Sequence, residues 1–124
     1  MIRTREARNI TVSIDCRFQQ AYDFLSVPGN FPKWVAATVH GPMKVRFSER
    51  NAFGVLDHSV IPRDGAEIYV PLRVVANGSG CELTLTLFRL PGTVEEQLSA
   101  DAQLVLRDLN AAKNLLERRG ASDG

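Results

Sequence analysis

Two adjacent residues, Asp57 and His58, are the strongest candidates for acid–base chemistry in this sequence. Consecutive residues of a β-strand point to opposite faces of a sheet, so only one of the two can face an interior. If the loop at Arg63-Asp64 has two residues, Asp57 pairs with Val70 and its carboxylate lies on the apolar face. A shift of the register by one residue would place His58 there instead. We expect the inward side chain, Asp57 on this pairing, to act as a general acid or base or to bind a ligand.

A structural role is the alternative for both residues. Asp57 could form an ion pair with Lys44 or Arg73, and the imidazole of His58 could bond to a backbone carbonyl. The two readings differ in what a substitution would change: ligand binding or turnover in the first, and stability in the second.

Other polar and aromatic residues could line a binding site. Arg89 has the same parity as the apolar residues of its strand, so it could bind an acidic group at a pocket mouth or remain a solvated strand-end arginine. Asp101 and Asp108 are seven residues apart on a predicted helix, and Asp101 lies closer to the apolar stripe. Trp34 and Tyr22 are large enough to close one end of a pocket or to belong to the core.

Several classes of function are not supported by the sequence. It contains no nucleophile elbow, phosphate-binding loop, dinucleotide fingerprint or zinc-protease motif, and with His40 and His58 as the only histidines we expect neither a metal nor a cofactor. The net charge of +1 gives no reason to expect nucleic-acid binding, and no apolar run is long enough for membrane insertion. Cys16 and Cys81 are expected to be reduced thiols of a cytoplasmic protein, since no signal-peptide pattern precedes the first strand.

A long helix is the main element predicted to position these side chains. It covers residues 93–119, begins at a capping box of Thr93 and Glu96, and is expected to end at Gly120. Its apolar stripe has helical spacing and consists of Val94, Leu98, Ala102, Val105, Leu109, Ala112 and Leu116. Such a stripe needs a sheet to cover.

The remaining elements are mostly strands. Alternating apolar residues between turn signals predict strands at residues 10–14, 43–48, 53–61, 67–76 and 81–90, with a further short strand at 35–40. Two short helices are expected at 18–25 and 31–34, capped by Asp15 and Asn30. A two-residue loop at Gly78-Ser79 would place Leu85 opposite Leu72 and Leu87 opposite Val70. Pro71 cannot donate to a ladder, so it predicts a bulge or an unpaired position.

These elements predict an α+β domain covering residues 1–124. A curved antiparallel sheet of about six strands wraps around one long C-terminal helix, with two short helices after the first strand. Because the sheet bends away from a single helix, a gap between them is expected to form a ligand pocket. We expect Val70, Leu72, Leu85, Leu87 and Val105 to line its apolar wall.

The chain resembles the START-like helix-grip superfamily, also called SRPBCC. The resemblance lies in ITVSIDCRFQQAYDFLSVPGNFPKW, NAFGVLDHSV and YVPLRVVANGSGCELTLTLFRLPG, and in the D-x6-D-L-x2-A-K-x2-L-E pattern of the last helix. It is most similar to the polyketide cyclase/dehydrase and lipid transport branch, which shares its fold with the birch-pollen allergen. The resemblance implies a helix-grip fold with a ligand-binding cavity, and is less specific for activity.

The function expected from these features is binding or carriage of a small, largely apolar molecule, aromatic or polyketide-like, by a monomer or homodimer. One alternative is an enzyme of the cyclase, dehydratase or isomerase type with Asp57 or His58 as acid/base. A second alternative is a ligand-free module that binds a partner protein, because the region between Trp34 and Met43 is short for this superfamily. The cavity distinguishes these three hypotheses. An enclosed cavity with an acid/base pair would support the enzyme, a dry apolar cavity would support the carrier, and the absence of a cavity would support the partner-binding module.

Overall fold

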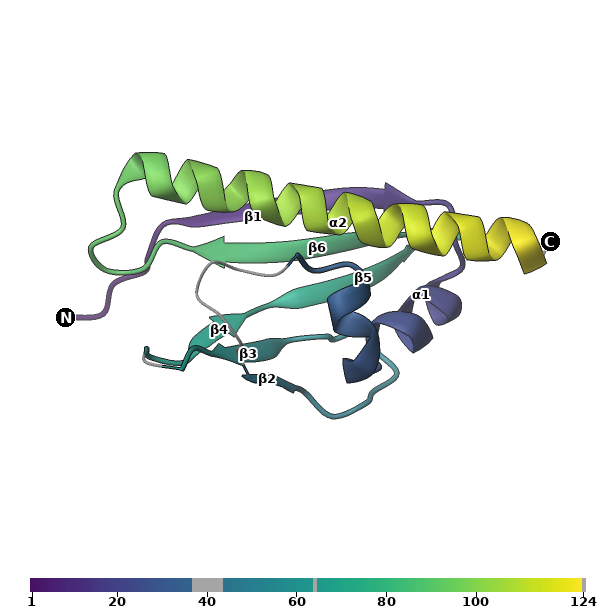
Figure 1. The fold of residues 1–124 in the computed structure, drawn as a ribbon, viewed down its shortest axis with the longest axis horizontal. Coiled ribbons are helices and arrows are strands. Elements are labelled where there is room, and N and C mark those ends of the chain that lie inside the picture. The colour runs from purple at the N-terminus through teal and green to yellow at the C-terminus, as the bar shows by residue number, and fades with distance from the viewer. Residues whose placement is uncertain (37–43, 64, 124) are drawn as a thin grey trace.

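The computed structural model describes residues 1–36, 44–63 and 65–119 in full and the backbone of residues 120–123. Its longest element is α2, the 29-residue helix Glu95–Asp123, which runs along the length of the molecule (Figure 1). Glu95 and Glu96 lie in its first turn, where negative charge is favoured by the helix dipole. The expected end at Gly120 is wrong, because the helix continues to Asp123. A single glycine costs a helix only about 1 kcal/mol relative to alanine, so it does not by itself stop one.

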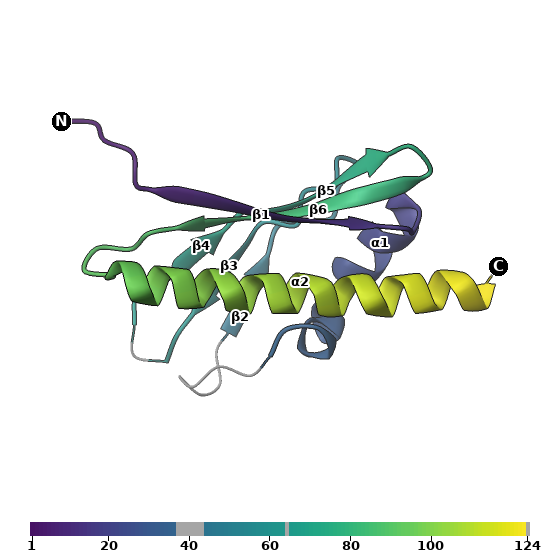
Figure 2. The same ribbon diagram turned by 90° about the horizontal axis from the view of Figure 1, so that it is seen from above.

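Three strands form the sheet beneath this helix, in the order β1-β6-β5 (Figure 2). These are β1 (Ala7–Ile14), β5 (Leu72–Asn77) and β6 (Gly80–Phe88), all antiparallel to their neighbours. The hairpin between β5 and β6 has the predicted two-residue loop, and Leu72 lies opposite Leu85 as expected. Gly78 takes a φ of 59° at the first loop position, a conformation that favours glycine.

Three shorter strands form a second antiparallel sheet, in the order β2-β3-β4. They are β2 (Lys44–Phe47), β3 (His58–Ile61) and β4 (Ile68–Val70). The strand expected at residues 53–61 is therefore shorter than predicted, with one isolated bridge from Val55 to Arg73 before it. At Gly54 the chain takes a φ of 77° and passes so close to the carbonyl of Val74 that a Cβ there would overlap it. Of the strand expected at 35–40, Val35 and Ala36 are not in a strand and the rest, with His40, lies outside the described residues.

Pro71 separates the two sheets, as its missing N–H predicts. Strand β4 ends one residue before it and β5 begins one residue after it, although its carbonyl still accepts the Thr86 N–H at 3.0 Å. The β5–β6 ladder ends at the pair Leu72–Leu85. It does not include Val70 and Leu87, which we expected to pair. Val70 pairs instead with His58 on β3.

Two short helices follow β1 and pack near the C-terminal end of α2 (Figures 1 and 2). They are α1 (Phe18–Leu25) and the 3₁₀ helix η1 (Pro28–Lys33). The expected caps are wrong: the cap positions are Arg17 and Val27, and neither side chain caps its helix. Asp15 lies too early in the chain, and Asn30 instead donates from its amide to the Phe24 carbonyl at 2.9 Å.

The hydrophobic core lies between α1, the β1-β6-β5 sheet and the C-terminal half of α2. It comprises Val12, Ile14, Cys16, Ala21, Tyr22, Phe24, Leu25, Trp34, Leu56, Leu72, Val74, Cys81, Leu83, Leu85, Leu109, Ala112 and Leu116. The apolar stripe is confirmed for its buried members, whereas Val94 precedes the helix and is 58% exposed. Both cysteines are free thiols, as expected. In the described part of the chain, no helix is long and apolar enough to cross a membrane.

Candidate functional site

A cleft of about 350 Å³ opens where β4 diverges from β6, beside the N-terminal half of α2. Its walls are mainly apolar and include residues of β4, β6, the β6–α2 loop and α2. The lining residues are Arg5, Glu67, Ile68, Tyr69, Val70, Thr86, Leu87, Phe88, Leu90, Thr93, Leu98 and Asp101. Because Tyr69 and Val70 point to opposite faces of β4, the cleft reaches both sides of the sheet at this break.

Arginines on β1 and just after β6 tie the start of α2 to the sheet and to the segment before β1. Arg8 donates to Glu95 Oε1 at 2.6 Å and to Ser99 Oγ at 3.3 Å. Arg89 donates from Nε to the Thr93 carbonyl at 2.9 Å and from Nη1 to Glu6 Oε1 at 3.1 Å. The sequence suggested Arg89 for the pocket mouth, but here it holds the β6–α2 loop and does not line the cleft.

Asp57 faces the outer side of the β2-β3-β4 sheet, contrary to the pairing on which we placed it inside. The structure pairs His58, not Asp57, with Val70, a shift of one residue. The reason is that the β3–β4 pairing begins at Val60 and Ile68, so that seven residues lie between the first paired positions instead of two, and an odd number exchanges the faces. Arg73 donates to both carboxylate oxygens of Asp57, at 3.0 and 2.8 Å.

Two further donors complete the surroundings of the Asp57 carboxylate. The Tyr69 hydroxyl donates to it at 2.8 Å and the Leu72 N–H at 2.9 Å. The Arg73 guanidinium, more than the other two donors, holds the pKa of Asp57 below its usual value, although partial burial opposes this. A carboxylate that is ionised and bonded in this way is a structural group rather than a catalytic acid.

His58 is the residue that enters the interior, where it is 5% exposed. Its Nδ1 lies 3.0 Å from the carbonyl oxygen of Leu56. Because a carbonyl only accepts, Nδ1 carries the hydrogen and the lone pair of the neutral ring is on Nε2. Burial lowers the pKa of His58, so the ring is neutral at pH 7.

Two aromatic side chains, Phe31 and Phe47, contact His58, and together with Trp34 they form the aromatic cluster. The ring centroids of Phe31 and Phe47 lie 5.5 and 4.9 Å from that of His58, and Trp34 meets Phe31 edge-on at 5.4 Å. Trp34 is 4% exposed, and its indole N–H has no hydrogen-bond partner among the described residues. A buried donor without a partner is costly, which makes Trp34 a candidate donor to a ligand. The cluster adjoins the cleft through Val70, the cross-strand neighbour of His58.

The other residues proposed from the sequence are divided between cleft and core. Val70, Leu87 and Asp101 line the cleft. Leu72, Leu85 and Tyr22 are buried in the core, and Val105 packs against it. The Tyr22 hydroxyl accepts the Asn51 N–H at 2.7 Å, and Tyr22 does not line the cleft.

Sequence reasoning missed Phe31 and Phe47 as neighbours of His58. The alternation of residues 43–48 was a signal for Phe47, since it placed this ring on the apolar face. No local signal identified Phe31.

Asp108, ranked below Asp101 from the sequence, accepts the Ala36 N–H at 3.3 Å, and burial raises its pKa. No group of three potential metal ligands occurs among the described residues.

Solved structures with the same fold include proteins of unrelated sequence. CalU16 from Micromonospora echinospora is 15% identical, with a TM-score of 0.65 over 86% of this chain and 71% of CalU16. DynU16, from the dynemicin biosynthetic locus, is 13% identical, with a TM-score of 0.70 over 90% of this chain and 47% of DynU16. Ara h 8.0201 is 8% identical, with a TM-score of 0.62 over 90% of this chain and 97% of that protein.

At the level of sequence, no protein-family profile and no curated protein matches the chain. The structural likeness covers between 86% and 90% of this chain in these three structures. The protein therefore has the α+β helix-grip fold of the START-like proteins, as the sequence resemblance predicted.

Proposed function

We propose that this protein binds a small, largely apolar molecule in the cleft between β4, β6 and α2, and that it acts as a binding or carrier protein. The cleft itself is the observation that carries the proposal, because its walls are mainly aliphatic and aromatic. Its volume of about 350 Å³ falls at the small end of the range of ligand pockets, roughly 300–1,000 Å³. Arg5, Glu67 and Asp101 supply the charged groups of its lining.

The aromatic cluster supports a ligand that also has a polar group. The Trp34 indole N–H is a donor without a partner in the described part of the chain, and Nε2 of His58 is an acceptor. Neither residue lines the cleft itself, so an aromatic or polyketide-like molecule with a hydroxyl or carbonyl group would have to extend past Val70 to reach them. That a protein of the dynemicin biosynthetic locus has the same fold is consistent with a small-molecule ligand.

An enzyme of the cyclase, dehydratase or isomerase type is the second candidate, and the state of His58 favours it. A neutral imidazole whose orientation is fixed by the Leu56 carbonyl can accept a proton at Nε2. Asp57 is the weaker choice for this role, since Arg73 and Tyr69 already bind its carboxylate. Turnover that is lost in His58→Gln, with binding retained, would distinguish an enzyme from a carrier.

The direct test is native mass spectrometry of freshly purified protein, followed by titration with the apolar fluorescent probe anilinonaphthalene sulfonate. Val70→Glu places a negative charge in the cleft and should abolish binding of the probe at this site. Val75→Glu is the matched control, since Val75 is 56% exposed on the same segment and does not line the cleft. Equal probe binding by the two variants would contradict the proposed site.

A further inference from the structure

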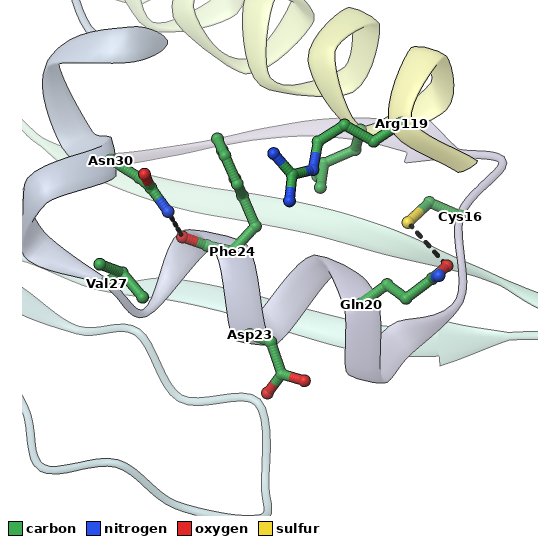
Figure 3. A pocket seen from close by; sticks show the side chains of 8 residues that line it. Cys16, Gln20, Asp23, Phe24, Val27, Asn30 and Arg119 are labelled. Atoms are coloured by element: carbon green, nitrogen blue, oxygen red, sulfur yellow. Dashed lines mark hydrogen bonds between the residues drawn. The ribbon is translucent and has the colours of Figure 1, made fainter. Parts of the chain in front are cut away.

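A second hollow, of about 340 Å³, lies at the opposite end of α2 from the cleft. It is bounded by α1, the start of η1 and the last fully described turn of α2. Figure 3 shows Arg119 reaching from α2 toward the ring of Phe24, with Cys16 and Gln20 on one side and Asn30 on the other. Its apolar lining consists of Phe24 and Leu116, both of them buried core residues, and Val27, which is 45% exposed.

Among the described residues, the guanidinium of Arg119 is held in place without an acidic partner. Its carbon lies 4.9 Å from the centroid of the Phe24 ring, a distance typical of stacking on an aromatic face. Stacking occupies the flat side of a guanidinium and leaves the N–H groups at its edge available for a carboxylate. No ion pair or hydrogen bond joins Arg119 to any other described residue.

The acidic groups nearest to this hollow are bound elsewhere. Asp23 points away from Arg119 in Figure 3 and is paired with Arg50. Glu117 accepts from Lys113 Nζ at 2.7 Å and from the Asp15 N–H at 2.8 Å. The thiol of Cys16 supplies no negative charge either, since burial raises its pKa.

A second cation adds to the positive potential at this end of the molecule. Lys33 Nζ lies 6.0 Å from the centroid of the same Phe24 ring and donates to Asn30 Oδ1 at 2.9 Å. An apolar floor beside an uncompensated guanidinium matches the chemistry of a small amphipathic anion.

We propose that this hollow is a second binding site, separate from the cleft, for a small carboxylate with an apolar body. Arg119 binds the carboxylate through its N–H edge, and the apolar body lies against Phe24 and Val27. Gln20 and Asn30 present side-chain amides at the rim, where they restrict the orientation of the bound molecule.

The test is a titration of the ¹⁵N-labelled full chain with benzoate at low ionic strength, followed by NMR. Saturable shifts are expected at the Arg119 Nε–H and at the backbone amides of Gln20 and Leu116. Shifts at Val70 and Leu87 would report the cleft instead, so the outcome at each site is independent of the other. Benzyl alcohol and inorganic phosphate, which lack the charge and the apolar body respectively, are expected to bind much more weakly.

Two variants are expected to lose affinity for benzoate. Arg119→Gln should weaken benzoate binding by about tenfold or more, because it removes a charge-assisted pair. Gln20→Glu should weaken it as well, since the exposed and isosteric carboxylate repels the ligand without disturbing the fold.

Arg118→Gln is the matched control. It removes the same charge from the neighbouring position, where the side chain bonds back to the Asn114 carbonyl, and should change affinity by less than about twofold. Equal losses in the two arginine variants would overturn the proposal. So would benzyl alcohol or phosphate binding as tightly as benzoate, or benzoate shifts that do not saturate.

Discussion

The two halves of α2 meet the rest of the protein in different ways. In the C-terminal half, Leu109, Ala112 and Leu116 are at most 1% exposed and belong to the main core with α1 and the β1-β6-β5 sheet. In the N-terminal half, Leu98 is equally buried but does not belong to that core, and it lines the cleft together with Asp101. One continuous helix therefore stabilises the fold at one end and borders a ligand-sized opening at the other.

The sheet, rather than the helix, accounts for this difference. Beneath the C-terminal half, β5 and β6 form a continuous ladder from Asn77–Gly80 to Leu72–Leu85. Beneath the N-terminal half, Pro71 interrupts the strand and β4 turns to pair with β3. A helix that is longer than the ladder below it must leave part of its apolar face over an opening.

The largest effect is expected from a truncation in the closed half. Leu109→Ala should lower the free energy of unfolding by about 2–5 kcal/mol, because it leaves a cavity at a fully buried position. Arg107→Ala, two residues away and largely exposed, should cost less than about 0.5 kcal/mol. Urea denaturation measures both, and similar losses would mean that the buried face of α2 is assigned incorrectly.

The second prediction concerns Asp57, which the structure assigns to stability. Asp57→Asn should cost about 1–3 kcal/mol, since it weakens a set of bonds to a carboxylate that is 12% exposed. Asp23→Asn is the control, because its ion pair with Arg50 is exposed and should contribute less than about 1 kcal/mol. Binding of an apolar probe should be unchanged in both variants. If Asp57→Asn lost affinity for the probe but kept its stability, Asp57 would have to be a residue of the binding site.

The comparison of Asp57 with His58 shows what local sequence can and cannot decide. Alternation alone established that their side chains take opposite faces. Which one enters depends on where the β3–β4 pairing begins, and the turn signal at Pro62–Gly65 did not show that the first pair is Val60 with Ile68. An error of one residue in a loop exchanges the two faces of a strand.

Predictions for the long elements were more reliable than predictions for their ends. The helical spacing of Leu109, Ala112 and Leu116 identified the buried face of α2, and the short loop after Asn77 set the register of β5 and β6. The location of the cleft was harder to predict. It depends on β4 leaving β6 after Pro71 to pair with β3, which is a tertiary preference rather than a local one.

The third prediction uses the titration of His58. Its pKa in the folded protein lies below the value of about 6.5 expected when unfolded, so the unfolded chain binds more protons between the two values. Stability should therefore be complete at neutral pH and fall as the pH drops below about 6.5, by up to about 1.4 kcal/mol per pH unit. Chemical denaturation at pH 5.5 to 8 should show this slope in wild type and in His40→Gln. The slope should be missing in His58→Gln; its persistence there would assign it to another group.

The smallest effects are expected from two aspartates of α2 that distinguish its open half from its closed half. Asp101 lines the cleft and accepts only the Gln97 side-chain amide, at 2.8 Å, among the described residues. Asp101→Asn should leave stability within about 0.5 kcal/mol but strengthen binding of the anionic probe by roughly twofold to fivefold, because one like charge is removed from the cleft.

Asp108→Asn should change stability and leave probe binding unaltered. Its carboxylate is partly buried with a raised pKa, so the neutral isostere should slightly increase stability at pH 7 while probe binding is unchanged. Fluorescence titration and urea denaturation of the two variants would test both statements together. If both aspartates altered binding equally, the ligand would have to extend along α2 well beyond the cleft, and the division between the two halves of the helix would fail.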